Sequence, residues 1–350
     1  MRASRILQAV EAHAEGEPGR VITGGMPLLR GNSVFEKMQD MAANHDDIRL
    51  TMLREPRGNP GLCGNAIVPP CHPEADAGFI IFEQTEYPPM SGSNTICVVT
   101  VLLETGIVPM TEPVTELVLE APAGLIRVRA DCRDGKVTRV AFRNVPAFAV
   151  HLDAQVEVAG LGTVSVDVAW GGMFFVLAGA ERLGVALDAD NGAEIVRVSE
   201  AIRHAAAEQL PVVHPENPEI TGPTITNLWG LPVAEGTHGR GAITISTGPF
   251  NPERPQDASG ILDRSPCGTG TCAKMAVLHA RGLLGIGQDY ANAGPLGTTF
   301  TGRIVEETQV GPYKAIVPTL SGQGWIYGLS SYTLDPSDPF PAGYTVGDMW

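Results

Sequence analysis

Positive charge is scarce in this sequence. Among its 350 residues, 24 are Lys or Arg against 39 Asp or Glu, so the formal net charge is −15. A chain this acidic, with no basic run, is a poor match for nucleic acid or an anionic membrane surface. None of its lysines lies in a motif typical of a pyridoxal phosphate site; they are Lys37, Lys136, Lys274 and Lys314.

Long apolar runs and a dense cysteine framework are also missing. No stretch approaches the ~20 apolar residues of a membrane helix. The N-terminal segment soon meets Glu11, Glu15 and Glu17, so it lacks the apolar region of a secretory signal. Six cysteines in 350 residues do not form a disulfide scaffold. We therefore expect a cytoplasmic protein with reduced thiols and without a membrane partner.

The composition that remains is typical of a loop-rich globular protein: 43% apolar and 18% charged residues, with 41 Gly and 28 Pro. At ~150 residues per domain, the length suggests two domains. Most of the chain predicts short strands and turns, and one amphipathic helix is clear over 193–209. The expected strands include 78–82, 124–128, 137–142, 164–168, 172–177, 241–246 and 302–306.

Two segments about half the chain apart resemble each other. The first begins Ser91-Gly-Ser-Asn-Thr95, and the second begins Cys267-Gly-Thr-Gly-Thr271. Each predicts a small-residue loop, a buried helix of about three turns and a glycine C-cap, at Gly106 and Gly282. The β-branched content of the first would also suit a strand. If the likeness is not chance among the many glycines, it predicts an α/β (α+β) chain of two related domains, each with a curved sheet around a buried helix.

The paired loops suggest a chemistry. A helix N-terminus offers free N–H groups and positive potential, so two of them facing across a cleft would hold one small carboxylate between Ser91 and Cys267. A cysteine there is expected to have its pKa lowered below about 8.5, which makes it a usable base. The N–H groups would stabilise the carbanion left by removal of an α-proton. An acid/base group on each face would invert the centre without a metal or an organic cofactor.

Other interpretations of these residues stay open. A cysteine after Pro266 is also typical of an inert core thiol, and a Cys–His hydrolase dyad has no identified histidine partner. Cys97 and Cys272 are expected to pack within helices, and Cys63, Cys71 and His72 lack zinc spacing. The Gly-Thr-Gly-Thr string matches neither a dinucleotide-binding nor a phosphate-binding loop.

The string Asp263–Thr271 (Asp-Arg-Ser-Pro-Cys-Gly-Thr-Gly-Thr) and the string Met90–Asn94 (Met-Ser-Gly-Ser-Asn) resemble the two catalytic loops of the proline racemase family. This family includes 4-hydroxyproline epimerases and trans-3-hydroxy-L-proline dehydratases. The likeness covers nearly the whole chain. Its further segments are 13–18, 54–58, 69–70, 144–146, 171–175 and 335–340.

The resemblance implies a diaminopimelate-epimerase-like fold, in which two pseudo-symmetric domains close on the substrate without a cofactor or metal. We expect halves of 1–157 and 158–332, with 333–350 returning to the first. A homodimer is a family-level expectation. Ser91 and Cys267 take the two acid/base positions and Asp263 faces the ring nitrogen of the substrate. The substrate-binding loop positions fall on Gly92, Ser93, Gly268 and Thr269.

The first loop departs from the family pattern. A typical racemase has Cys-Gly-His where this chain has Ser91-Gly-Ser, and dedicated 3-hydroxyproline dehydratases have Cys in the first loop and Thr in the second. The Ser/Cys pair resembles the subgroup associated with two reactions. These are dehydration of trans-3-hydroxy-L-proline to Δ1-pyrroline-2-carboxylate and 2-epimerisation of trans-4-hydroxy-L-proline to cis-4-hydroxy-D-proline.

A bifunctional hydroxyproline enzyme is therefore the leading interpretation. Within the family, the alternatives are a single-activity 4-hydroxyproline 2-epimerase and a proline racemase. Outside it, they are a non-catalytic amino-acid-binding protein and a Cys-dependent hydrolase.

Overall fold

The computed structural model describes residues 3–232 and 234–347. The chain divides into two compact units, unit 1 (Met1–Phe142 and Gly322–Trp350) and unit 2 (Arg143–Ser321). Both divisions come earlier than the expected 157/158 and 332/333. The first does so because strand β8 (Ala147–Val158) pairs with β9 (Gly162–Trp170) inside unit 2. The second does so because β19 (Gly324–Leu334) pairs with β1 (Arg5–Ala14) inside unit 1.

Unit 1 is built on a mixed sheet wrapped around one helix, α3 (Gly92–Glu104), which contacts β1, β2, β3 and β19. The pairing order is β19–β1–β2–β3–β4–β5–β6, with parallel pairs at β2–β3 and β4–β5. The bounds are β2 (Glu17–Gly24), β3 (Cys63–Val68), β4 (Ala77–Phe82), β5 (Val114–Ala121), β6 (Gly124–Arg133) and β7 (Lys136–Arg143).

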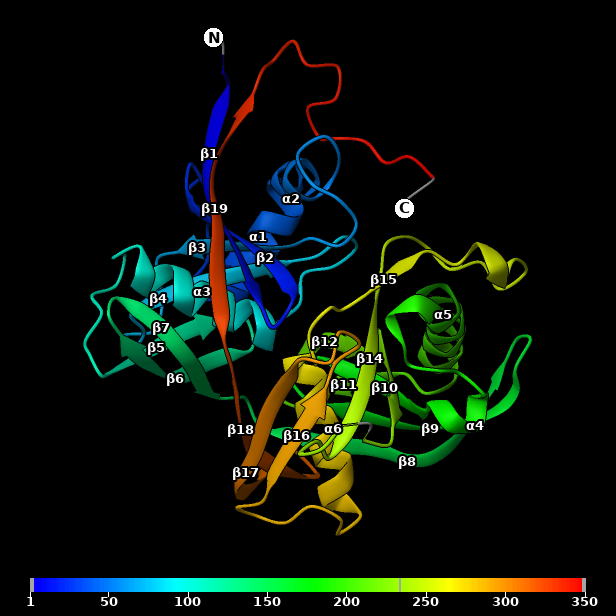
Figure 1. Ribbon diagram of the computed structural model, residues 1–350. Coiled ribbons are helices and arrows are strands. Elements are labelled where there is room, and N and C mark those ends of the chain that lie inside the picture. Colours follow the sequence, from blue (N-terminus) through cyan, green and yellow to red (C-terminus); the bar gives the residue numbers. More distant parts are fainter. Residues whose placement is uncertain (1–2, 233, 348–350) are drawn as a thin grey trace. The chain divides into compact units, whose positions relative to one another are not determined.

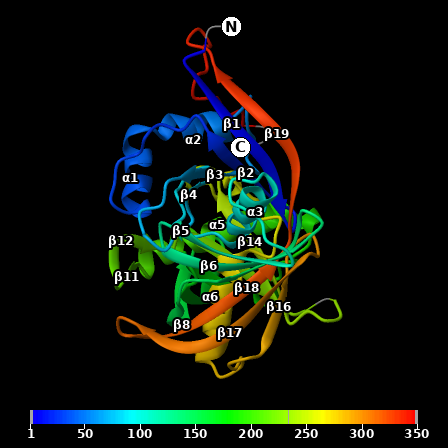
Figure 2. The ribbon, with the colours of Figure 1, turned by 90° about the vertical axis from the view of Figure 1, so that its left-hand side faces the viewer.

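Two further helices, α1 (Val34–Asn44) and α2 (Asp46–Leu53), cover the side of β3 and β4 that faces away from α3 (Figure 1). Figure 2 shows the same arrangement within unit 1 after a quarter turn. Met41 and Ile48 from these helices share a core with Ile22 and Phe82 from the sheet. The sequence did not predict α1 and α2.

Unit 2 is a closed ring of strands. Its pairing order is β8–β9–β10–β13–β14–β16–β17–β18, and β18 returns to β8 through Ile316 opposite Ala147. Helix α6 (Gly268–Ala280) contacts β8, β9, β10, β14 and β17, so the ring encloses it. The remaining bounds are β10 (Phe174–Gly179), β13 (Ile225–Gly230), β14 (Gly239–Ser246), β16 (Asp289–Ala293), β17 (Thr299–Val310) and β18 (Tyr313–Gly322).

Outside the ring, helix α5 (Gly192–Gln209) confirms the amphipathic helix expected over 193–209. Its buried face, including Ile195, Val198 and Ile202, packs with Val166 and Val176 in a second core. Unit 2 also contains three short strands, one short α-helix and two 3-10 helices: α4 (Ala180–Leu183), η1 (Ala189–Asn191), β11 (Val212–His214), β12 (Asn217–Gly222), η2 (Pro255–Asp257) and β15 (Gly260–Leu262).

The internal repeat is confirmed as two loop-helix segments. Helices α3 and α6 are each 13 residues long, and Gly106 and Gly282 follow their ends with φ of 74° and 70°. That left-handed conformation is the one glycine adopts without steric cost. The strand interpretation of the first segment is wrong. In the part of the chain that the structure describes, no helix combines the length and apolar character needed to cross a membrane.

Helix α6 carries a lysine into the interior of unit 2. Lys274 is 5% exposed, and its ammonium lies 3.3 Å from the centroid of the Trp229 ring. Burial lowers the pKa of Lys274 to about 8, although the nearby Asp167 acts in the opposite direction. Asp167 also accepts a hydrogen bond from Arg281 at 2.6 Å, so its charge is shared between two cations.

We expect Lys274→Met to remove a pH dependence of stability. Because the folded-state pKa of about 8 lies below the ordinary 10.5, the unfolded chain binds more protons between these values. The free energy of unfolding of the wild type therefore rises with pH across this interval, by at most about 3 kcal/mol. Urea unfolding over the interval should show this slope in the wild type and in an exposed control, Lys314→Met. An equal slope in Lys274→Met would contradict the assignment.

Candidate functional site

Ser91 is the N-cap of α3, the role for which serine is favoured. Its Oγ accepts hydrogen bonds from the backbone N–H of Asn94 at 3.4 Å and from the Asn94 side-chain Nδ2 at 3.0 Å. The Ser93 Oγ lies 3.3 Å from it. Gly92 and Ser93 form the first turn, where N–H groups have no acceptor within the helix. The first predicted loop is therefore a compact polar cluster with free N–H donors.

Cys267 is the N-cap of α6 in the same way. Its Sγ accepts from the N–H of Gly270 at 3.3 Å and lies 3.7 Å from Thr269 Oγ1. The backbone of Cys267 has φ of 57° and ψ of 116°, which is uncommon for a residue other than glycine. Such conformations persist where the surrounding structure imposes them and are concentrated at functional sites. Gly268 and Thr269 are the first-turn residues here.

Asp263 is tied to Cys267 through a bridging serine. Its Oδ1 accepts from the N–H and the hydroxyl of Ser265, both at 2.8 Å, and Ser265 Oγ accepts from the N–H of Cys267 at 3.0 Å. All three residues are buried. The carboxylate is thereby held at a defined position beside the thiol. Ser265 is a residue that the sequence analysis did not single out.

Buried asparagines hold the backbone of the second loop. Asn292 Nδ2 donates to Pro266 O at 3.1 Å, and Asn227 Nδ2 donates to Gly270 O at 3.3 Å. A Cβ at Gly171 would lie 2.2 Å from Thr269 O, so the turn between β9 and β10 needs glycine at this position. Of these three supports, only Gly171 lies in a segment that resembles the family. No local sequence pattern identifies Asn227 and Asn292 as residues that hold the second loop.

The expected lowering of the Cys267 pKa is wrong. Burial raises the pKa of this thiol well above its ordinary value, and the charge of Asp263 raises it further. The Gly270 N–H and the Thr269 hydroxyl act in the opposite direction without cancelling these effects. The helix N-terminus thus supplies the predicted donors, but the surrounding protein excludes the water that would solvate a thiolate. The resting form is the thiol.

The structure brings the predicted residues together within each unit. Ser91, Gly92 and Ser93 share the first turn of α3 in unit 1. In unit 2, Cys267, Gly268 and Thr269 share the first turn of α6, with Asp263 beside them. No disulfide joins the six cysteines, all of which lie among the described residues, and burial raises the pKa of Cys272 to about 12, as expected for a packing thiol.

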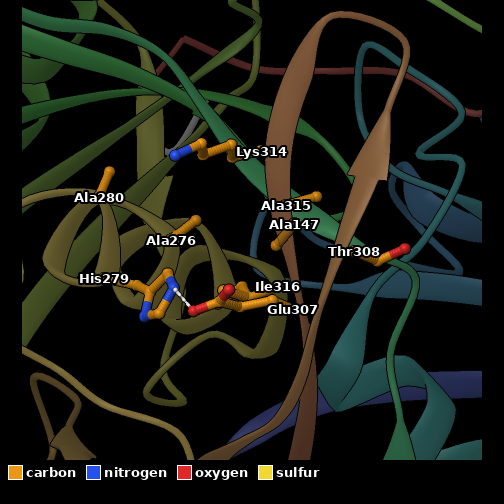
Figure 3. Close-up of a pocket in the computed structure, with 9 residues that line it drawn as sticks. All are labelled: Ala147, Ala276, His279, Ala280, Glu307, Thr308, Lys314, Ala315 and Ile316. Carbon is orange, nitrogen blue, oxygen red and sulfur yellow. Dashed lines mark ion pairs between the residues drawn. The ribbon is translucent and has the colours of Figure 1, made fainter.

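A cavity of about 380 Å³ lies elsewhere in unit 2, at the C-terminal end of α6 (Figure 3). An ion pair between His279 Nε2 and Glu307 Oε1, 3.1 Å apart, closes one side of it. The rest of its lining comes from α6, β8, β17 and β18: Ala147, Ala276, Ala280, Thr308, Lys314, Ala315 and Ile316. None of the predicted site residues lines it, so it is separate from the loop at the other end of α6.

Comparison with known proteins gives one match to a family model and three informative matches to solved structures. Residues 9–345 match the model of the proline racemase family. A hydroxyproline epimerase from Agrobacterium vitis, solved with bound trans-4-hydroxy-L-proline, is 34% identical, with a TM-score of 0.91 over 100% of this chain and 98% of that one. A probable proline racemase from Agrobacterium radiobacter K84, solved with bound carbonate, is 36% identical, with a TM-score of 0.90 over 98% of each chain.

The third solved structure is more distant. A phenazine biosynthesis protein of the PhzF family from Bacillus anthracis is 12% identical, with a TM-score of 0.56 over 93% of this chain and 99% of that one, and it shares the fold alone. The fold class expected from the sequence is confirmed by these matches.

We expect Asp263→Asn to lower the pKa of Cys267, because it removes the negative charge that opposes thiolate formation. The amide oxygen can still accept from Ser265, so the loop support is kept. The pH dependence of iodoacetamide alkylation, followed by mass spectrometry of the Cys267 peptide, should shift to lower pH in this variant. Asp257→Asn, in the exposed 255–257 turn, serves as a control. An unchanged or higher midpoint in Asp263→Asn would contradict the charge effect.

Proposed function

The chain belongs to the proline racemase family, and on this premise we propose that it is a cofactor-independent hydroxyproline 2-epimerase that also dehydrates trans-3-hydroxy-L-proline. The observation that carries the proposal is the pairing of an alcohol with a thiol at the heads of two otherwise matched helices, Ser91 on α3 and Cys267 on α6. In such a pair the thiol acts as the base and the alcohol as the proton donor. Two thiols would be equivalent, so that either could take either role.

The substrate carboxylate is bound by backbone N–H groups in this proposal. The first turns of α3 and α6 present the N–H groups of Gly92, Ser93, Gly268 and Thr269, which suit a small anion. In this proposal one substrate carboxylate accepts hydrogen bonds from both sets of donors. They also stabilise the charge that develops when the α-carbon loses its proton. The overall acidity of the chain does not prevent binding, because these donors act at short range.

Substrate binding activates the thiol. The ring nitrogen of a hydroxyproline is a secondary ammonium group at neutral pH, and in this proposal it pairs with the Asp263 carboxylate. This pairing offsets the negative charge that otherwise raises the pKa of Cys267. Cys267 then releases its proton to solvent as the substrate binds and, as a thiolate, takes the α-proton of the substrate. The base is thereby generated where and when substrate is present.

The position of the hydroxyl group decides the outcome. In a 4-hydroxyproline no leaving group lies β to the carbanion, so Ser91 returns a proton to the opposite face and the epimer forms. In trans-3-hydroxy-L-proline the carbanion expels the 3-hydroxyl, which leaves as water after receiving a proton from the donor. The resulting enamine tautomerises to Δ1-pyrroline-2-carboxylate. Both reactions share the first step, so one site performs both.

The relatives support the epimerase half of the proposal most directly. The 34% identical protein from Agrobacterium vitis is a hydroxyproline epimerase with trans-4-hydroxy-L-proline bound. The dehydratase half rests on the Ser/Cys pair. A single-activity epimerase would epimerise trans-4-hydroxy-L-proline without forming pyrroline from the 3-hydroxy isomer. A proline racemase would turn over L-proline, and a binding protein would leave every α-proton unexchanged.

We expect the wild type in D2O to epimerise and α-deuterate trans-4-hydroxy-L-proline and to convert trans-3-hydroxy-L-proline to the pyrroline. Cys267→Ala should abolish α-exchange with both, because it removes the base. Cys272→Ala, a neighbouring buried thiol on the same helix, should retain both activities and controls for loss of packing. Proton NMR measures exchange and epimer formation, and absorbance of the pyrroline measures dehydration. Exchange retained in Cys267→Ala would refute its role as the base.

A further inference from the structure

The two matched loops carry different residues at the fourth position. The difference changes the contacts made by the first residue of each loop, Ser91 or Cys267. The first loop has Asn94 where the second has Gly270. Asn94 is 2% exposed and contacts Ser91 with both its backbone N–H and its side-chain Nδ2. Gly270 contacts Cys267 with its backbone N–H alone. A Cβ at Gly270 would lie 3.1 Å from the Cys267 sulfur, so the second loop has little room for a side chain there.

The Asn94 contacts determine which way the Ser91 hydroxyl points. A serine oxygen has two acceptor sites and one proton to donate. The two N–H groups of Asn94 occupy both acceptor sites of Ser91 Oγ, at 3.4 and 3.0 Å. In the remaining contact, with Ser93 Oγ at 3.3 Å, Ser91 must therefore be the donor. The Ser91 hydroxyl proton therefore points away from Asn94 and is available for donation.

The orientation of the Asn94 side chain is itself set by its neighbours. Asn65 Nδ2 donates to Asn94 Oδ1 at 2.6 Å and lies 3.5 Å from the backbone carbonyl of Arg20. A backbone carbonyl can only accept, so a flipped Asn65 would place its own amide oxygen against the Arg20 carbonyl. With Asn65 oriented in this way, Asn94 must present its NH2 group to Ser91. The chain of hydrogen bonds from Arg20 to Ser91 therefore has one direction.

The second loop has the opposite polarity. Cys267 Sγ receives the Gly270 N–H, and the Thr269 hydroxyl 3.7 Å away also acts to stabilise its charged form. There the Thr269 hydroxyl is the donor once Cys267 is a thiolate, whereas in the first loop the Ser91 hydroxyl donates to Ser93.

We propose that Asn94, held by Asn65, is a positioning residue that keeps the Ser91 hydroxyl proton available for donation to the carbanion when trans-4-hydroxy-L-proline is epimerised. This inference rests on the proposed function, in which Cys267 is the base and Ser91 the donor. Asn94 acts through Ser91 and does not itself exchange protons with the substrate.

The test separates the two proton transfers. In D2O, deuterium enters trans-4-hydroxy-L-proline with retained configuration through Cys267 alone, whereas epimer formation also requires donation by Ser91. The ratio of retained-configuration exchange to epimerisation therefore reports the donation step. We expect Asn94→Ala to raise this ratio by at least about tenfold, the effect of losing one hydrogen bond of ordinary strength. Ser91→Ala should raise it at least as much.

Two further variants make the test specific. The double variant Asn94→Ala/Ser91→Ala should match Ser91→Ala, because Asn94 acts only through Ser91. The isosteric Asn94→Asp keeps the packing but offers Ser91 an acceptor in place of a donor, so it should also raise the ratio at neutral pH. Thr100→Val, which removes a buried hydroxyl further along α3, controls for loosening of the helix and should leave the ratio unchanged.

The failures are distinguishable. If Ser91→Ala raises the ratio but both Asn94 variants leave it at the wild-type value, the inference is overturned and the proposed function stands. If Asn94→Ala and Ser91→Ala have additive effects, or if Thr100→Val raises the ratio as well, the positioning role is also overturned. If Ser91→Ala itself leaves the ratio unchanged, the donor role of Ser91 fails and the inference fails with it.

Discussion

A buried helix begins with backbone N–H groups that have no acceptor within the helix, and much of this structure follows from that constraint. Helices α3 and α6 are enclosed by strands and begin at Ser91 and Cys267, whose side chains each satisfy one of these donors. The others, at Gly92, Ser93, Gly268 and Thr269, are left for a ligand. A small anion is the ligand that completes such a turn at the least cost. The proposed binding of a carboxylate thus follows from where the helices begin.

The same enclosure sets the acid–base chemistry, because excluding water acts on both head groups. It raises the pKa of the Cys267 thiol and strengthens the electrostatic repulsion between the Asp263 carboxylate and a thiolate at Cys267. In the proposed mechanism the base forms only when a cation pairs with Asp263, which protects the thiol from unproductive reaction in the empty enzyme. On the other helix, burial leaves Ser91 with fixed partners. Its polarity is therefore set by Asn94 and Asn65 and not by solvent.

Much of the fold could be predicted because its signals are local. The repeat at 91–106 and 267–282 combines a small-residue loop, an apolar helix and a terminal glycine, and each part has a short-range physical cause. The amphipathic helix α5 was equally readable from its spacing. Helices α1 and α2 were missed because they are short, and a short helix depends for its stability on packing, here against β3 and β4. The boundaries near 142 and 321 depend on strand pairings between distant segments, which no local pattern reports.

The sequence by itself determined the family, the two loops and the residue at the head of each, because these are matters of residue identity and spacing. Only the tertiary structure decided how those residues behave. A helix N-terminus alone would favour a thiolate at Cys267, but the closed ring of unit 2 and the adjacent Asp263 reverse that preference. Likewise, the sequence does not show how the Asn94 amide is oriented. Its orientation is set by Asn65, which lies on a strand nearly thirty positions earlier. Charge and hydrogen-bond direction depend on everything within a few ångströms, and folding brings those groups together from across the chain.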